Sequence, residues 1–188
     1  ITMLPNSVSF VDRELTEVLE NGGSDFWVIN CSNVRPHAYY LDAVSKKWFG
    51  KSISDEEQSR EFALDYYNGS DPVAMCYRKY PEAMIPYGEH EDDHMGEQFY
   101  TENLRIIAHH FLVDRNQNAE SLYWIAGTGS LYDQTMRVCG LCRNGMEGLK
   151  AYYHLCEQVS QSLAGAEKTL FDATLFLQVK IHAFCAEG

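Results

Sequence analysis

The spacing of the apolar residues changes along this chain, and that change restricts the folds it can adopt. In the first half, apolar residues recur every three or four positions, as in residues 7–21, where Val11, Leu15 and Val18 share one helical face. In the second half the pattern favours strands, because residues 104–113 form a β-branched apolar run. Helical and strand patterns in one chain indicate a mixed fold.

Start and stop signals divide the first half into helices. Asn21-Gly22-Gly23 ends the first one, and Ser54 to Glu57 is a capping-box pattern that opens another. We expect helices over residues 7–21, from Pro36 to about Phe49, from Ser54 to Asn68 and, briefly, from Asp71 to Pro81. Residues 81–96 contain two prolines and two glycines and are expected to form a loop.

Four segments are expected to build a small sheet and its covering helix. Residues 104–113 and 121–126 predict a β-hairpin with a turn at residues 116–118, although residues 97–111 also fit a helix. Residues 177–183 alternate apolar and polar side chains, as a half-buried strand does. Residues 145–163 repeat apolar side chains at helical spacing.

These segments predict a single α+β domain over residues 1–188. N-terminal helices precede a mixed or antiparallel sheet, made of the hairpin and the C-terminal strand and packed by the helix at about 145–163. With 188 residues and 45% hydrophobic content, the chain can bury a core without metals or disulfides. A short apolar run at residues 26–31 is also of strand type.

The net charge of −12 constrains the partners of this chain. Such a surface repels nucleic-acid phosphates and anionic lipid, and it favours a basic protein partner. Nucleic acid and membrane are therefore not expected as partners. No apolar run approaches about 18 residues, and residues 1–5 lack the pattern of a signal peptide.

Cys139 and Cys142 form a CxxC pair just before the helix expected at residue 145. A helix N-terminus lowers a thiol pKa, so this spacing indicates a redox site. The alternatives are reduced structural thiols and a metal site. His154 and Cys156 cannot complete a zinc site together, since residues two apart on a helix point to nearly opposite sides.

The run from Glu89 to His94 is rich in side chains that bind metals. On a helix, His90, His94 and Glu97 would share a face, and imidazole with carboxylate suits zinc, iron or manganese. A solvated acidic loop explains the same residues, because glycines flank the run. We expect no bound metal and no cofactor, and these three residues are the candidates if a metal is present.

Cys31 is the candidate nucleophile, because it follows the short apolar run and precedes a helix that begins near Pro36. A thiol at such a turn needs a histidine as general base, which His109 or His110 could supply from a later strand. Asp114 could orient that histidine. These residues outline a cysteine–histidine hydrolase or transferase.

Residues 137–142 read Arg-Val-Cys-Gly-Leu-Cys, which resembles the acyl-CoA loop of a family of N-acetyltransferases with the pattern Arg/Gln-x-x-Gly-x-Gly/Ala. The resemblance implies backbone amides that hold pyrophosphate at a helix start. Cys142 stands where that pattern has a small residue, and the match covers six residues.

The sequence thus favours an acidic protein-interaction module of the inhibitor, immunity or effector type. Strong negative charge, many tyrosines and the absence of a complete catalytic pattern favour it. The alternatives are an enzyme that uses Cys31 and an acyltransferase-like enzyme.

Overall fold

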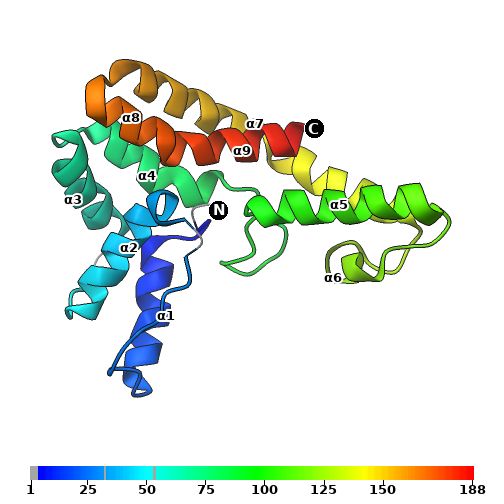
Figure 1. Cartoon of the computed structure of the whole chain (residues 1–188), viewed down its shortest axis with the longest axis horizontal. Coiled ribbons are helices and arrows are strands. Elements are labelled where there is room, and N and C mark those ends of the chain that lie inside the picture. Colours follow the sequence, from blue (N-terminus) through cyan, green and yellow to red (C-terminus); the bar gives the residue numbers. More distant parts are fainter. Residues whose placement is uncertain (1–3, 32, 53) are drawn as a thin grey trace.

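The computed structural model describes residues 4–31, 33–52 and 54–188, and the regular elements of this part of the chain are helices (Figure 1). Ile1–Met3, part of the segment in which the sequence shows no signal-peptide pattern, lie outside the described residues. The elements are α1 (Val8–Glu20), α2 (Val34–Trp48), α3 (Asp55–Tyr67), α4 (Asp71–Ala83), α5 (Glu97–Asp114), the 3-10 helix η1 (Glu120–Leu122), α6 (Tyr123–Ala126), α7 (Leu131–Ser162), α8 (Gly165–Ala173) and α9 (Leu175–Glu187).

The helices form a body with two arms (Figure 1). The body contains α3, α4, α8, α9 and the C-terminal half of α7, which packs against both α4 and α9. Helices α1 and α2 pack on each other and project from the body as one arm. The other arm, called the α5 arm here, consists of α5, η1, α6 and residues 131–138 of α7. The 32-residue α7 runs through body and arm alike.

The α+β prediction is wrong, because the described residues contain no sheet. The expected hairpin strands, residues 104–113 and 121–126, lie in α5 and in η1 and α6. The expected C-terminal strand, residues 177–183, lies in α9, and residues 26–31 form no strand. The described residues contain one isolated β-bridge, which pairs Pro86 with His94.

Helix α9 shows why alternation was misleading. Its buried apolar residues Leu175, Phe176, Val179 and Ala183 follow a helical spacing. Two polar residues, Gln178 and His182, are buried on the same side, whereas Leu177 is exposed. Because some polar residues of α9 are buried and some apolar residues are exposed, the sequence alternates between apolar and polar side chains as a strand does, although the segment is a helix.

All four N-terminal helices are confirmed, and the cap signals of α1 and α3 are formed. Helix α2 begins at Val34, before Pro36, and α4 continues past Pro81 to Ala83. Ser7 accepts a hydrogen bond from the amide of Phe10 at 2.9 Å, and Ser54 with Glu57 forms a complete capping box. Asn68 ends α3 with a left-handed φ of 52°. The helix expected at 145–163 is real but starts earlier, because a second capping box at Ser130 opens α7.

The core of the body is rich in tyrosines that were candidates for a binding surface. The hydroxyls of Tyr67 and Tyr77 lie 3.2 Å apart, and that of Tyr77 lies 3.1 Å from Oγ1 of Thr174. Tyr152 donates to the carbonyl of Cys76 at 2.5 Å. These hydroxyls are paired inside the protein, so they contribute to packing and not to an exposed surface.

Gly145 allows α7 to approach the segment after α4, and its replacement is expected to be harmful. A Cβ at Gly145 would lie 2.6 to 2.9 Å from three side-chain atoms of buried Ile85. Gly145→Ala should therefore lower the free energy of unfolding by about 1–3 kcal/mol. In the same helix, a Cβ at Gly148 would meet nothing within 4 Å. Gly148→Ala should raise that free energy by about 0.5–1 kcal/mol.

Urea unfolding of the two alanine variants, measured beside the parent chain, checks that the two substitutions change the free energy of unfolding in opposite directions. Both variants carry the same chemical change within one helix, so helix propensity alone would move them in the same direction. Equal stabilisation by both would show that α7 does not pack closely on Ile85.

Candidate functional site

Exposed apolar side chains gather on the α5 arm, as they also do along α1, α2 and the segment between them. Leu112 is 82% exposed and Phe111 is 60% exposed, and Val113 and Tyr132 are exposed as well. The buried residues of α5, in contrast, are confined to its first turns: Phe99, Tyr100 and Asn103. The apolar run that predicted a strand is therefore a helical segment that the rest of the described chain leaves largely uncovered.

A groove of about 580 Å³ lies between α5 and the beginning of α7 on this arm. Its lining is almost entirely apolar, with Arg115 as the charged residue. The lining residues are Leu104, Ile107, Ala108, Phe111, Arg115, Leu131, Tyr132 and Thr135. Contiguous apolar surface of this kind marks interaction sites in soluble proteins, and the groove is wide enough to receive side chains from another molecule.

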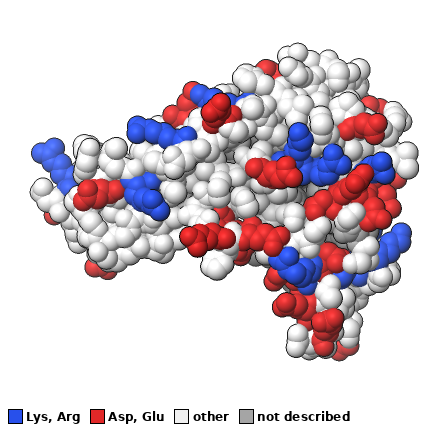
Figure 2. All heavy atoms as spheres, turned by 180° about the vertical axis from the view of Figure 1, so that it is seen from behind, with Lys and Arg blue, Asp and Glu red and all other residues white. Residues whose placement is uncertain are grey.

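The charge of the molecule is distributed unevenly. Residues 1–96 hold 17 of the 27 acidic residues and 8 of the 15 basic ones. Figure 2 shows acidic side chains gathered over the centre and lower right of that view, while the α5 arm, at the left, carries scattered charges of both signs among uncharged side chains. The apolar arm and the acidic part of the surface are thus different regions of one molecule.

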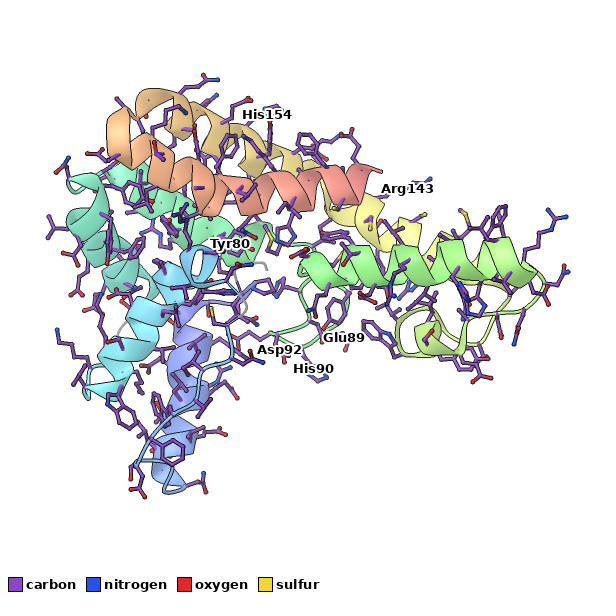
Figure 3. All side chains as sticks on the ribbon, viewed as in Figure 1. Tyr80, Glu89, His90, Asp92, Arg143 and His154 are labelled. Atoms are coloured by element: carbon purple, nitrogen blue, oxygen red, sulfur yellow. The ribbon has the colours of Figure 1, made fainter. Side chains whose placement is uncertain are left out.

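The acidic loop between α4 and α5 does not form a metal site. Glu89, His90 and Asp92 lie at its outer turn (Figure 3). His94 takes part in the bridge to Pro86, and Glu97 begins α5, so His90, His94 and Glu97 do not share a helical face. Among the described residues, no three ligating side chains come close enough to hold a metal ion.

Cys31 lies in the segment between α1 and α2, far along the chain from the histidines proposed as its base. It lines a cavity of about 620 Å³ that also contains His37, in the first turns of α2. Burial lowers the pKa of His37, which favours a neutral imidazole. The thiol of Cys31 donates to the carbonyl of Asn33 at 3.2 Å.

His109, His110 and Asp114 lie on α5. The two histidines line a shallow pocket with Arg105, and the side chain of Asp114 accepts from the amide of Asn116 at 3.0 Å. The structure therefore brings Cys31 together with His37 and not with the three residues chosen from the sequence. The sequence signal for His37 was its position one residue after the helix-starting Pro36.

Cys139 and Cys142 lie within α7, not before it, so the prediction that they occupy a helix N-terminus is wrong. Inside the helix the amides of residues 137–142 are engaged in the helical ladder, and the loop that the acyltransferase resemblance requires is not formed there. Burial, and then the nearby thiol of Cys139, raises the pKa of Cys142. A raised pKa at Cys142 is the opposite of the depressed pKa that a reactive redox thiol has.

The two cysteines share a pocket with a third one, Cys185 of α9, which the sequence gave no reason to select. Burial raises the pKa of Cys185 as well. All six cysteines are free thiols in the structure. Cys185 stands three positions after buried His182 and comes beside Cys142 because α9 packs along α7.

The helices of the described residues include none with the length and apolar content needed to cross a membrane. The longest, α7, has charged side chains distributed along it, among them Arg137 and Glu147. The chain matches no protein-family model, and comparisons with curated proteins and with solved structures found no match either.

Proposed function

We propose that the chain is a protein-interaction module that binds an amphipathic helix of a basic partner protein in the groove between α5 and α7. The observation that carries this proposal is the exposed apolar groove of about 580 Å³ on the α5 arm. A groove between two helices accepts the apolar face of a third, which presents its side chains at three- and four-residue spacing.

The uncovered half of α5 supplies much of the apolar surface that a partner would bury. Leu104, Phe111 and Tyr132 border or line the groove and keep much of their surface in water. Covering a large apolar side chain is worth about 1.5–3 kcal/mol, so three such residues supply a binding contribution of the size that interaction hot spots have. No helix of the described chain covers them.

The charge of the chain defines the partner further. A net charge of −12 attracts a basic protein and accelerates its approach, although the groove itself is apolar. Salt should accordingly slow association more than it accelerates dissociation. The partner supplies an apolar helical face for the groove and lysine or arginine side chains around it.

Phe111→Asp tests this proposal with a matched control, Phe49→Asp. Both phenylalanines are exposed, Phe111 at 60% on the α5 arm and Phe49 at 79% at the end of α2. The probe is a fluorescent helical peptide of about 20 residues with leucine on one face and lysine on the others. Phe111→Asp should weaken its binding at least tenfold, as expected for a hot-spot residue, and Phe49→Asp should leave it unchanged.

Fluorescence anisotropy measures these affinities at low and at moderate salt. A peptide with glutamate in place of lysine should bind more weakly at low salt, and the difference should shrink as salt is added. Equal loss of affinity in both phenylalanine variants would contradict the groove as the binding site. Equal affinity for the lysine and glutamate peptides would contradict a basic partner.

An enzyme that uses Cys31 is the second candidate, because Cys31 and His37 line one cavity. General-base catalysis needs the imidazole within hydrogen-bond reach of the thiol, whereas the thiol contacts the carbonyl of Asn33. Alkylation of Cys31 near neutral pH distinguishes the two candidates. Rapid alkylation that is lost in His37→Gln would favour the enzyme over the interaction module.

A further inference from the structure

A second pocket, which adjoins the groove and shares Leu104 with it, lies where the α5 arm joins the body. It has a volume of about 320 Å³ and is enclosed by α5, α7 and α9. Its apolar walls come from Phe99, Leu104, Val138 and Met146. The three thiols of Cys139, Cys142 and Cys185 complete the inner surface. The enclosure, size and apolar lining are those of a small-molecule site.

The buried end of this pocket contains a hydroxyl without a partner. Tyr100 is 2% exposed, and its hydroxyl has no hydrogen-bond partner among the described residues. Tyr100 lines the pocket together with Cys142 and Cys185. Burial, and then the neighbouring thiols of these two residues, raises the Tyr100 pKa, so the hydroxyl stays a neutral donor. Leaving a buried hydroxyl unpaired costs about 1–3 kcal/mol. A ligand atom that accepts its proton would recover that cost.

The mouth of the pocket carries positive charge in an otherwise acidic protein. Lys150 is paired with Glu187 at 2.7 Å. Arg143 is exposed, and no ion pair to it is present in the described part of the chain. It lies on α7 beside the C-terminal end of α9 (Figure 3). An unpaired guanidinium at the edge of an apolar pocket is suited to a carboxylate.

We propose that this pocket binds a small keto acid whose body is mainly apolar. Its carboxylate pairs with Arg143 at the mouth, its hydrocarbon part lies against Phe99, Val138 and Met146, and its carbonyl oxygen accepts a hydrogen bond from Tyr100. The proposal concerns a different site from the groove of the proposed function, so either can fail without the other.

Binding of para-acetylbenzoate, followed by ligand-observed NMR, tests the proposal. Tyr100→Phe and Arg143→Gln should each weaken binding about three- to tenfold, the loss expected for one hydrogen bond or charged contact. The matched control is Arg137→Gln, which removes an arginine from the same helix outside the pocket lining, and it should not change the affinity.

Two related probes assign each contact. The affinity of para-isopropylbenzoate, which lacks the carbonyl, should be insensitive to Tyr100→Phe. The affinity of para-methylacetophenone, which lacks the carboxylate, should be insensitive to Arg143→Gln. Bound para-acetylbenzoate should also slow the alkylation of Cys139, Cys142 and Cys185, and leave that of Cys31, in another cavity, unchanged.

Three results would overturn the proposal: no detectable binding, binding that neither Tyr100→Phe nor Arg143→Gln affects, or equal slowing of alkylation at Cys31. If Tyr100→Phe does not fold, Met146→Trp replaces it, because the larger ring enters the pocket from a half-buried position. That variant must then abolish both binding and thiol protection, and retention of either also overturns the proposal.

Discussion

Leu149→Ala is expected to lower the free energy of unfolding by about 2–5 kcal/mol, the range for a buried leucine that leaves a cavity. Leu149 is 0% exposed and belongs to the main core cluster. It lies in the part of α7 that belongs to the body, which packs against α4 and α9. Because the side chain is fully buried within this cluster, the structure has little freedom to collapse into the space that it vacates.

Urea unfolding of Leu149→Ala and of Leu64→Ala provides the comparison. Leu64 is 67% exposed on α3, so the same truncation there should change the free energy of unfolding by no more than about 0.5 kcal/mol. Similar losses in both variants would mean that α7 does not form the centre of the core.

Acid is expected to destabilise the protein through His182, by roughly 3 kcal/mol between pH 6.5 and pH 4. The side chain is 0% exposed, and burial lowers its pKa from 6.5 to about 4. Between these values the unfolded chain binds a proton that the folded chain does not, so stability falls as the pH falls, by about 1.4 kcal/mol per pH unit. Above pH 6.5 this effect is absent.

The groups that contact His182 do not offer it a charge partner. Tyr80 of α4 lies 3.1 Å from its Nε2, and Tyr100 of α5 makes a ring contact at 5.8 Å (Tyr80 is labelled in Figure 3). Its Nδ1 has no hydrogen-bond partner in the described part of the chain. A protonated imidazole would therefore be buried without a counter-ion, which is costly.

Unfolding curves of His182→Gln across this pH range isolate the contribution. Glutamine stays uncharged, so the free energy of unfolding of the variant should fall less steeply than that of the parent between pH 6.5 and pH 4. The slopes should differ by up to about 1.4 kcal/mol per pH unit, which corresponds to one bound proton. His154→Gln is the control, because His154 is exposed on α7. An unchanged slope in His182→Gln would show that other groups control the acid response.

The N-terminal helices could be predicted because their signals are local. The Ser54–Glu57 capping box and the stop at Asn68 depend on residues within one or two turns, and the structure contains both. Packing against the rest of the chain adds to these helices without changing their boundaries. In this half, local propensity and tertiary structure agree.

In the second half the helix at residues 145–163 was predicted, but α5 and α9 were not, because their apolar residues do not mark a single buried face. In α5 the β-branched run at residues 104–113 is largely exposed, so its pattern reflects a surface and not the core. In α9 the buried pair Gln178 and His182 breaks the apolar stripe. Hydrophobic periodicity reports helix or strand only when burial follows apolar character.

The candidate sites show the same division. Cys139 and Cys142 were found from their spacing alone, which is local, but Tyr100, Arg143 and Cys185 join them only through the packing of α5 and α9 on α7. Likewise, Cys31 was selected from its neighbours in sequence, whereas its histidine partner was sought on a strand that does not exist.

The length of α7 has a mechanical consequence. At 1.5 Å per residue the helix is about 48 Å long, and it joins the groove at one end to the core at the other. From Gly145 to Leu131 the lever is about 21 Å, so a bend of about 10° near the glycine displaces the groove by roughly 4 Å. The same stretch of helix forms one wall of the second pocket, which is lined by Cys139, Cys142 and Cys185. A load applied to the arm by a bound helix would thus be transmitted to that wall, so the stiffness of α7 couples the two sites in addition to Leu104, the lining residue that they share.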